Sequence, residues 1–367
     1  MFKANIARRG AKLRRGEIKT AHGVLKTPFF MPDATRGFVK QTNNNDLLAV
    51  GIPALVVNTF HLYLQPGLKV IKAAGGIHKF MNWNKPLLSD SGGFQVFSLI
   101  HKNPQMGKIS ADKVIFKSPL DGSRHELTPE KSIQIQFDLG VDMMVCLDDC
   151  PPNDFDRLAL EKAVVRTIAW AKRCKIEYEK QVKKRKLSGA KRPLLFGVIQ
   201  GGAELDLRRV CAEELVKIGF DGYGFGARPV DKEGNFLAEV LQYTADLIPE
   251  KAIRFALGIG TPEDIRRCAA MGWDIFDCVI PTREGRHGRL LLEQKGKEEI
   301  MNINNAKWQT DFKAINPKSD LPLLKNQSRA YLHHLFRLDD PLGQNLASLN
   351  NLEFYTRLMK KIREGKK

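Results

Sequence analysis

Eight short apolar runs, rich in β-branched and aromatic residues, recur along the 367-residue chain, and most intervals between them carry helical spacing. The runs span residues 28–33, 54–60, 87–90, 143–148, 194–200, 222–226, 254–260 and 275–281. Near-continuous apolar runs are typical of parallel strands that are covered on both faces. Eight such strands alternating with helices predict an α/β fold, the (β/α)8 TIM barrel.

Two segments depart from this alternation. In residues 114–127, an Asp121-Gly122 pair separates two strand-like arms, which predicts a β-hairpin inserted after the third strand, above the barrel mouth. After Arg289 the barrel pattern ends, and helical spacing predicts helices at about residues 328–338 and 352–363. We therefore expect a catalytic barrel over residues 1–300 and a mostly helical C-terminal subdomain over residues 301–367, packed on the barrel.

The chain is strongly basic, with 59 Lys and Arg against 41 Asp and Glu and a formal net charge of +18. The basic residues gather in residues 8–15, 180–192 and 283–289, and in the tail from Lys360. Any one cluster is ordinary for a solvated face. Together they favour RNA or DNA over an anionic membrane or an acidic protein as the partner. Charge alone does not separate RNA from DNA.

Composition also argues against several classes of protein. No apolar run approaches the roughly 18 residues that span a bilayer, and the first residues contain no apolar signal-peptide segment. Six cysteines are scattered singly, with neither a disulfide framework nor a zinc-ligand spacing. We expect a reduced, cytoplasmic protein without a membrane partner.

Polar residues and glycines mark the ends of the predicted strands. They are Asp33, Asn58, Asp90, Asp148, Gln200, Gly226, Gly258 and Asp277. The carboxyl ends of barrel strands carry the active sites of this fold, so the pattern indicates an enzyme. Asp277 interrupts an apolar run and precedes three arginines, and Asp90 ends another such run. A carboxylate among apolar side chains is costly without a partner, so the two acids predict acid chemistry on a polyanion.

Five motifs give the chain a family resemblance. They are Asn58-Thr59-Phe60-His61-Leu62, Ser89-Asp90-Ser91-Gly92-Gly93-Phe94-Gln95, Phe116-Lys117-Ser118 with Leu120-Asp121-Gly122-Ser123, Gly197-Val198-Ile199-Gln200-Gly201, and Phe276-Asp277-Cys278-Val279-Ile280-Pro281-Thr282-Arg283. From about residue 15 to the C-terminus, the chain resembles the tRNA-guanine transglycosylase (queuine tRNA-ribosyltransferase) family of the bacterial type. The resemblance implies a (β/α)8 barrel that exchanges the wobble guanine of tRNA for a 7-deazaguanine, a queuosine precursor or queuine.

The resemblance also implies roles for the two acids and the partners of the protein. Asp277 would be the nucleophile at the anomeric carbon of the ribose, and Asp90 would be the general base toward the incoming base, in a ping-pong reaction. The structural alternatives are a salt bridge of Asp277 with an arginine and a cap of Asp90 on the Ser91-Gly92-Gly93 amides. The implied partners are a tRNA anticodon stem-loop, guanine or a 7-deazaguanine base, and a second copy of the chain in a homodimer.

Further residues match the family's base and tRNA sites. Asp148 and Gln200 would bind the Watson–Crick edge of the base, with Asp148 accepting from the ring N–H and the amine and Gln200 donating to the carbonyl. Phe94 and Leu257 would sandwich the base. The remaining residues implied are Ser91, Gly226 and Ala227 for the base and Asn58, Arg283, Arg286 and Arg289 for tRNA. Hydrogen bonding at the barrel mouth is the structural alternative for Asp148 and Gln200.

The chain departs from the family at a metal site. The family holds a structural zinc ion with three cysteines and a histidine, whereas Ser319, Leu321, Leu324 and Asn350 stand at these positions here. We therefore expect neither a metal nor another cofactor, with Leu321, Leu323 and Leu324 filling the space by apolar packing.

A second departure affects the choice of incoming base. The family's glycine-rich loop after the sixth strand reads Gly226-Ala227-Arg228-Pro229-Val230 here. Ala227 adds a methyl group and Pro229 removes an N–H, and both changes fall where the family's loop contacts the substituent of the base. Arg228 also places a cation near the position of an aminomethyl substituent. We therefore expect an altered preference for the incoming base, with the aminomethyl base as the leading single candidate.

Two alternatives to an active transglycosylase remain. One is a catalytically silent tRNA-binding partner of an active subunit, which the altered zinc site would suit. The other is base exchange in another nucleic acid. The retention of Asp277 and Asp90 favours the enzyme, because a silent subunit has no use for them.

Overall fold

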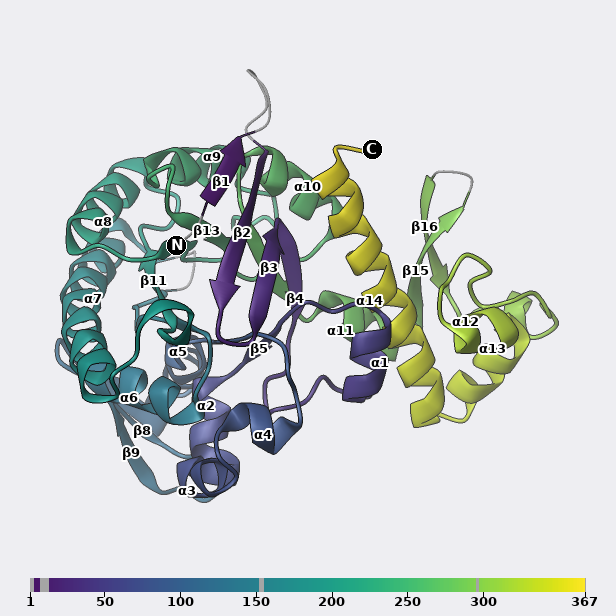
Figure 1. Ribbon diagram of the computed structural model, residues 1–367, viewed down its shortest axis with the longest axis horizontal. Helices are drawn as coiled ribbons and strands as arrows, with labels where there is room; N and C mark the ends of the chain where they lie inside the picture. Colours follow the sequence, from purple (N-terminus) through teal and green to yellow (C-terminus); the bar gives the residue numbers. More distant parts are fainter. Residues whose placement is uncertain (1–2, 7–12, 152–154, 295–296, 367) are drawn as a thin grey trace.

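The computed structural model describes residues 3–6, 13–151, 155–294 and 297–366 (Figure 1). Eight parallel strands form its central sheet, and each overlaps one of the eight predicted runs. They are β4 (Phe29–Pro32), β5 (Leu55–Val57), β6 (Leu87–Ser89), β10 (Met143–Val145), β11 (Leu194–Ile199), β12 (Gly222–Phe225), β13 (Ile253–Ala256) and β14 (Ile275–Cys278). Most of the basic cluster predicted at residues 8–15 lies outside the described residues.

The sheet closes on itself. Its strands run in the order β4-β14-β13-β12-β11-β10-β6-β5, all through parallel pairings. The two outer strands meet where Asp33 and Val56 form a parallel bridge and the Ala34 N–H donates to the Val56 carbonyl at 2.7 Å. The predicted (β/α)8 barrel is therefore confirmed.

Helices surround the barrel (Figure 1). Short helices connect its first strands, namely α1 (Asn44–Ala49), α2 (Thr59–Leu62), α3 (Leu68–Ala73), α4 (Ile77–Met81) and α5 (Gly93–Lys102). Later connections use α6 (Pro129–Leu139), α7 (Arg157–Lys184), α8 (Leu205–Ile218), α9 (Ala238–Leu247) and α10 (Pro262–Ala270). Helix α6 shows why they begin and end where they do. The Thr128 hydroxyl accepts from Lys131 N, Pro129 occupies the first turn, and Gly140 takes a left-handed φ of 76° at the end.

The barrel interior is apolar along the strands and becomes polar at their carboxyl ends, which form the mouth. Alternate strand residues point inward, among them Phe29 and Met31 of β4, so Asp33 continues their inward row. The same step of two residues sets Asn58 above Val56, Asp90 above Leu88, Gln200 above Val198, Leu257 above Phe255 and Asp277 above Ile275. Strand geometry thus brings side chains from distant parts of the sequence to one end of the barrel.

A three-stranded antiparallel sheet is inserted between β6 and α6. It contains β7 (Gly107–Ile109), β8 (Val114–Lys117) and β9 (Arg124–Leu127). The predicted hairpin is confirmed as β8 and β9, whose turn holds Gly122 at a φ of 74°. Strand β7 is a third member that the sequence pattern did not predict.

The N-terminal sheet was also not predicted. It contains β1 (Lys3–Ile6), β2 (Arg14–Thr20) and β3 (Gly23–Thr27). Ile18 and Leu25 are buried in the same cluster as the inward barrel residues, so the β2–β3 hairpin covers the end of the barrel opposite the mouth. Charged residues alternate with these two apolar ones, which left too weak an apolar run to identify from sequence.

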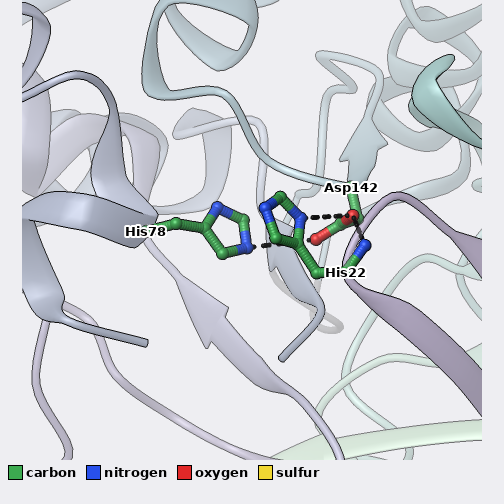
Figure 2. A group of neighbouring side chains, drawn as sticks. All are labelled: His22, His78 and Asp142. Carbon is green, nitrogen blue, oxygen red and sulfur yellow. Dashed lines mark hydrogen bonds and ion pairs between the residues drawn. The ribbon is translucent and has the colours of Figure 1, made fainter. Parts of the chain in front are cut away.

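At this closed end, His22, His78 and Asp142 form a cluster (Figure 2). The two imidazole rings stack with their centroids 3.6 Å apart. Asp142 Oδ1 accepts from Nδ1 of His22 at 2.9 Å, and Oδ2 lies 3.2 Å from Nε2 of His78 and accepts from Leu87 N at 2.9 Å. The cluster ties the β2–β3 turn and α4 to the start of two barrel strands.

The C-terminal part packs on the barrel through one long helix. Its elements are α11 (Ile280–Arg286), β15 (Arg289–Gln294), β16 (Lys297–Asn302), α12 (Pro322–Asn326), α13 (Arg329–Arg337) and α14 (Pro341–Glu364). Both predicted helices are present, although the second begins at Pro341 rather than at residue 352. Helix α14 contacts α11, β15, β4 and α10, and it lies between the barrel and the outer elements (Figure 1). The division of the chain at residue 300 stays a prediction.

Within the described residues, none of the helices combines the length and the apolar character that crossing a membrane requires.

Candidate active site

Asp277 and Asp90 are half-buried at the mouth of the barrel, beside the ends of β14 and β6. One oxygen of the Asp277 carboxylate accepts a hydrogen bond from Gly258 N–H at 2.9 Å. The arginines that follow Asp277 in sequence pair with Glu284 instead, at 3.6 Å for Arg283 and 3.1 Å for Arg289. Asp277 therefore forms no salt bridge with Arg283 or Arg289, so a structural ion pair with either arginine does not account for its place at the mouth.

Asp90 is held by neighbouring backbone groups. Its Oδ1 accepts from the N–H of Thr59 and of Gly92, both at 3.0 Å, and the Asn58 side-chain amide donates to its Oδ2. Asn58 also accepts from His61 N at 3.0 Å, which caps α2. The Gly92 bond corresponds in part to the structural alternative for Asp90. Asn58, which was predicted to bind tRNA, uses its side chain here to orient Asp90.

Burial raises the pKa of both acids to about 7. The charge of Asp33 contributes to this rise for each acid, and the charge of Asp277 contributes to it for Asp90, whereas the backbone hydrogen bonds oppose the shift. Carboxyl groups with such pKa values exchange protons near neutral pH. One of them can then donate a proton while the other attacks as a carboxylate. Asp33 was noted at a strand end from sequence, but no role was assigned to it.

A second polar group lies beside the acids, formed by Asp148 and Gln200. Gln200 Nε2 donates to Asp148 Oδ2 at 2.7 Å, and burial raises the Asp148 pKa to about 7. Gln200 Oε1 is buried and has no hydrogen-bond partner. Sequence reasoning expected Gln200 to donate to a carbonyl, whereas this arrangement offers an acceptor. A base that presents an N–H or amine donor would satisfy that oxygen.

Backbone geometry next to Gln200 leaves no room for a side chain. A Cβ added at Gly226 would lie 2.3 Å from Gln200 Nε2, so only glycine fits beside the amide. The next residue, Ala227, has a φ of 119°, which is strained for any residue other than glycine and costs about 1–3 kcal/mol. Such strain persists where the surrounding structure enforces it, and it marks the loop 226–230 as part of the site.

Arg208 of α8 supports this group, and the sequence contained no signal for it. Its guanidinium is fully buried, and it donates to the carbonyls of Ile199, Gly202 and Gly226 at 2.8–3.0 Å. It also stacks over the Phe225 ring, 4.0 Å from the centroid. Burial lowers the Arg208 pKa to about 9. The residue fixes the ends of β11 and β12, and with them the backbone around Gln200.

The other predicted base-binding residues line the mouth separately. Phe94, at the start of α5, is 56% exposed, and Leu257 is only partly buried against the interior core at the end of β13. The Ser91 hydroxyl accepts from Gly93 N at 3.2 Å and lowers the pKa of Asp148 by hydrogen bonding. Two open apolar faces near a polar edge suit a planar aromatic ligand.

The predicted tRNA-binding arginines gather on α11 and the start of β15. Arg283 and Arg289 are exposed and share Glu284, and Arg286 is half-buried close enough to Asp33 for their charges to interact. This arrangement sets a positive surface beside the acids. It suits the phosphates of a nucleic acid whose sugar lies at Asp277.

The described part of the chain contains one group of side chains close enough to share a metal ion, the cluster of His22, His78 and Asp142 (Figure 2). It lies at the closed end of the barrel, away from the acids. Its carboxylate already accepts from the backbone N–H groups of His22 and Leu87 as well as from the His22 ring. These bonds explain the cluster as a clamp that joins three elements of the fold.

A closed (β/α)8 barrel with paired acids at the carboxyl ends of its strands defines the class of barrel enzymes that act through two carboxylates. Comparison with known proteins gives the family. The family model for queuine tRNA-ribosyltransferase matches residues 10–365, so the chain belongs to this family.

Relatives in the family cover nearly the same length. The chain is similar to the queuine tRNA-ribosyltransferase of Halothermothrix orenii, with 43% identity over 96% of this chain and 90% of that protein. It is 42% identical to that of Caldanaerobacter subterraneus over the same shares. It is 41% identical to that of Lysinibacillus sphaericus over 97% of this chain and 88% of the relative.

Proposed function

We propose that this protein exchanges the wobble guanine of tRNA for a 7-deazaguanine through a covalent ribosyl-enzyme intermediate. Family membership supports the activity, and the single structural observation that carries it is the pair of acids at the barrel mouth, each with a pKa of about 7. A silent tRNA-binding subunit would not need such a pair, because burying two acids opposes folding.

In the first half-reaction, the Asp277 carboxylate attacks the anomeric carbon C1′ of the target nucleotide. The C1′–N9 bond breaks, its electron pair goes to the departing guanine, and protonated Asp90 supplies the proton that neutralises this base. The product is a ribosyl ester of Asp277. An oxocarbenium-like transition state favours a close carboxylate on one side and an acid on the other, as in retaining glycosidases.

The second half-reaction runs in the opposite direction with a new base. Asp90, now a carboxylate, takes the proton from N9 of the incoming 7-deazaguanine. That nitrogen attacks C1′, and the ester bond breaks to release the Asp277 carboxylate. The proton returns to Asp90, so the enzyme ends in the state in which it began.

Asp148 and Gln200 would select a guanine-like base. The free Gln200 Oε1 and the Asp148 carboxylate together offer acceptors to the ring N–H and the exocyclic amine. Rotating the Gln200 amide by 180° would instead present a donor to the carbonyl, as the sequence led us to expect, and it requires a protonated Asp148 that donates to the amide oxygen. Phe94 and Leu257 would stack on the two faces of the base.

The incoming base is proposed to carry an aminomethyl substituent. The Arg228 side chain is exposed, so its cation does not have to occupy the space beside the loop 226–230 where the substituent would lie. Competition among the aminomethyl, cyano and cyclopentenediol bases for incorporation into tRNA tests this point. We expect faster incorporation of the aminomethyl base, and comparable rates for all three would show that the loop does not discriminate.

The protein is further proposed to work without the family's zinc ion. Ser319, Leu321, Leu324 and Asn350 offer no thiolate or imidazole, so they do not fit a zinc site. Ser319 instead donates to Glu353 at 2.6 Å, and Asn350 donates to the Leu291 carbonyl at 2.9 Å.

Apolar side chains fill only part of the space around the zinc-ligand positions. Leu321 and Leu324 are buried as expected, but Leu323 is 47% exposed, so its predicted part in the filling is wrong. The Glu353 carboxylate, on α14, also accepts from Asp320 N at 2.6 Å and from Arg357 at 2.9 Å. A hydrogen-bonded group centred on Glu353 thus holds the loop against α14.

Covalent trapping tests the proposed nucleophile. Protein mixed with tRNA in the absence of an incoming base and then denatured should carry a bound RNA. The Asp277→Asn variant should carry none while still binding tRNA. An RNA adduct of the same yield in that variant would remove Asp277 from its role.

A further inference from the structure

Asp33 is the third acid at the barrel mouth, and the two-acid mechanism leaves it without a task. It continues the inward row of Phe29 and Met31 along β4. Strand β4 pairs with β14 so that Asp277 stands opposite Met31, two residues before Asp33. Cα atoms in this diagonal position on neighbouring parallel strands lie about 8 Å apart, by the rise along a strand and the spacing between strands. That separation leaves room for one sugar between the two carboxylates.

The order of strands around the closed barrel places Asp33 opposite the base-binding group. That order is β4-β14-β13-β12-β11-β10-β6-β5. Asp148 and Gln200 follow β10 and β11, in one half of the mouth. Asp277 at the end of β14 and Asp90 just past β6 lie on the two sides of this half. The arc that remains between the two acids consists of β4 and β5.

A guanine held by Asp148 and Gln200 points its sugar toward this arc. The Watson–Crick edge of guanine and N9 lie at opposite ends of the base, so an edge bound at β10 and β11 turns N9 away from those strands. The ribose bonded to N9 then lies toward β4 and β5, where Asp277 reaches C1′. Its 2′-OH is on the carbon next to C1′, so a side chain beside the nucleophile is placed to bind it.

Polar side chains follow both strands of the arc, Asn58 after β5 and Asp33 after β4. Asn58 uses both polar groups of its side chain within the protein, since the amide donates to Asp90 and the oxygen accepts from His61 N at 3.0 Å. Asp33 is half-buried, and its Oδ1 accepts from the Thr35 hydroxyl at 2.8 Å. An ionised carboxylate has about four acceptor sites, so Asp33 can accept a further hydrogen bond while Thr35 orients it.

The cation next to Asp33 also suits a nucleotide. Arg286 of α11 lies close enough to Asp33 for their charges to interact. In a ribonucleotide, the 2′-OH is adjacent to the 3′-oxygen that carries the following phosphate. A ribose whose hydroxyl reaches Asp33 would therefore bring that phosphate toward Arg286, which offsets the repulsion between phosphate and carboxylate.

We propose that Asp33 accepts a hydrogen bond from the 2′-OH of the target ribose and thereby selects RNA over DNA. The inference rests on the proposed function, because it takes Asp277 as the nucleophile at C1′. The 2′-OH is the group by which a protein tells RNA from DNA at a given position. Hydrogen bonds to this hydroxyl strengthen as an oxocarbenium-like transition state forms. Asp33 thus raises kcat/KM for a ribose substrate and has far less effect on a deoxyribose substrate.

Two synthetic anticodon stem-loops test this contact. One carries guanosine at the wobble position, and the other carries 2′-deoxyguanosine at that position only. The readout is the ratio of kcat/KM for the two substrates in exchange of labelled guanine. Comparing this ratio between enzymes cancels the different intrinsic reactivity of the two glycosidic bonds. Asp33→Ala should lower the ratio about tenfold to hundredfold, because a hydrogen bond to a charged group is lost.

Three further variants separate the contact from other effects. Asp33→Asn keeps the size and one acceptor oxygen but removes the charge, so it should lower the ratio less than Asp33→Ala does. Thr35→Val removes the hydroxyl that orients Asp33 and should also lower the ratio by a smaller amount. Asp112→Ala is the matched control, since that side chain is 89% exposed, and it should leave the ratio unchanged.

A ratio for the two Asp33 variants equal to that of wild type would overturn the inference. An equal loss with both substrates would overturn it too, since Asp33 would then act on something other than the 2′-OH. Asp33→Asn decides the outcome if melting curves show that the alanine variant does not fold. Wild-type protein that binds the ribose stem-loop but exchanges no guanine would instead contradict the proposed function, which keeps the two failures distinguishable.

Discussion

At the scale of single residues, the acids of the mouth work against the stability of the fold. Burial raises the pKa of Asp277 from its ordinary value of 3.8 to about 7. A folded-state pKa above the unfolded value stabilises the protein fully below the unfolded pKa, and this contribution is lost as pH rises through 7. The native state at pH 8 therefore holds a charge that the unfolded chain accommodates more easily.

Replacing Asp277 by Asn should raise the melting temperature at pH 8 by about 2 °C and leave it unchanged near pH 4, because the amide is never charged. Thermal unfolding at both pH values measures this difference. Asp112→Asn is the control, since that side chain is 89% exposed and should show no such pH dependence. Equal melting temperatures of Asp277→Asn and wild type at pH 8 would mean that the Asp277 carboxylate is not destabilised.

Sequence reasoning found the acids because a lone carboxylate inside an apolar run is conspicuous. It could not assign Asp33 a role, because its effect depends on which strands become neighbours when the barrel closes. Arg208 gave no signal at all, since one arginine on an amphipathic helix reads as solvent-exposed. Its task appears only when three backbone carbonyls converge on it.

At the scale of elements, helix α14 joins the catalytic and C-terminal parts. Asn351 donates to the carbonyls of Pro281 and Arg289 at 3.0 and 2.9 Å, and Glu353, two residues further along the helix, holds the loop around Ser319. The helix thus fixes both ends of the segment 281–289, which contains Arg283, Arg286 and Arg289. We propose that these side-chain hydrogen bonds take the place of metal coordination.

Chelation should therefore leave the fold intact. Treatment with EDTA should change neither the melting temperature nor the exchange rate, because none of the four zinc-ligand positions carries a ligand. Melting curves before and after dialysis, together with metal analysis, measure this. One zinc ion per chain in active protein, lost together with stability, would refute metal independence.

Glu353→Gln should lower the free energy of unfolding by about 2 kcal/mol, because the buried Glu353 carboxylate, which accepts from Ser319, Asp320 N and Arg357, loses its charge and one acceptor oxygen. Denaturant unfolding measures the loss. Glu364→Gln on the same helix is the control and should change stability by no more than about 0.5 kcal/mol, since Glu364 is exposed. Equal effects of the two substitutions would show that Glu353 does not hold the loop.

Elements were predictable where the apolar pattern was strong. All eight barrel strands and the β8–β9 hairpin were identified, because buried parallel strands and an Asp-Gly turn both leave clear signals. The pairs β2–β3 and β15–β16 were missed because charged residues interrupt their apolar positions. The start of α14 was placed too late, since Pro341 reads as a break although it occupies the first turn of the helix.

At the scale of the whole molecule, the net charge of +18 and the arginines around the mouth favour a polyanion. Binding of tRNA should weaken steeply with salt, because each phosphate contact releases counterions. Arg289→Ala should reduce the slope of log K against log salt concentration by about 0.7, the value for one contact to single-stranded nucleic acid. Lys217→Ala on α8, whose lysine pairs with Glu214, is the matched control and should leave the slope unchanged.

A slope that is the same for Arg289→Ala and wild type would remove Arg289 from the tRNA interface. The homodimer stays a prediction of the family resemblance, and light scattering of the purified protein would test it.

Exchange of labelled guanine into a tRNA with a uridine-guanine-uridine anticodon loop tests the central claim most directly. The assay should use protein of known metal content and compare wild type with Asp277→Asn. We predict incorporation by metal-free wild-type protein and none by the variant. Absence of exchange by folded wild-type protein that binds the tRNA would contradict the account and favour a silent partner or another nucleic acid.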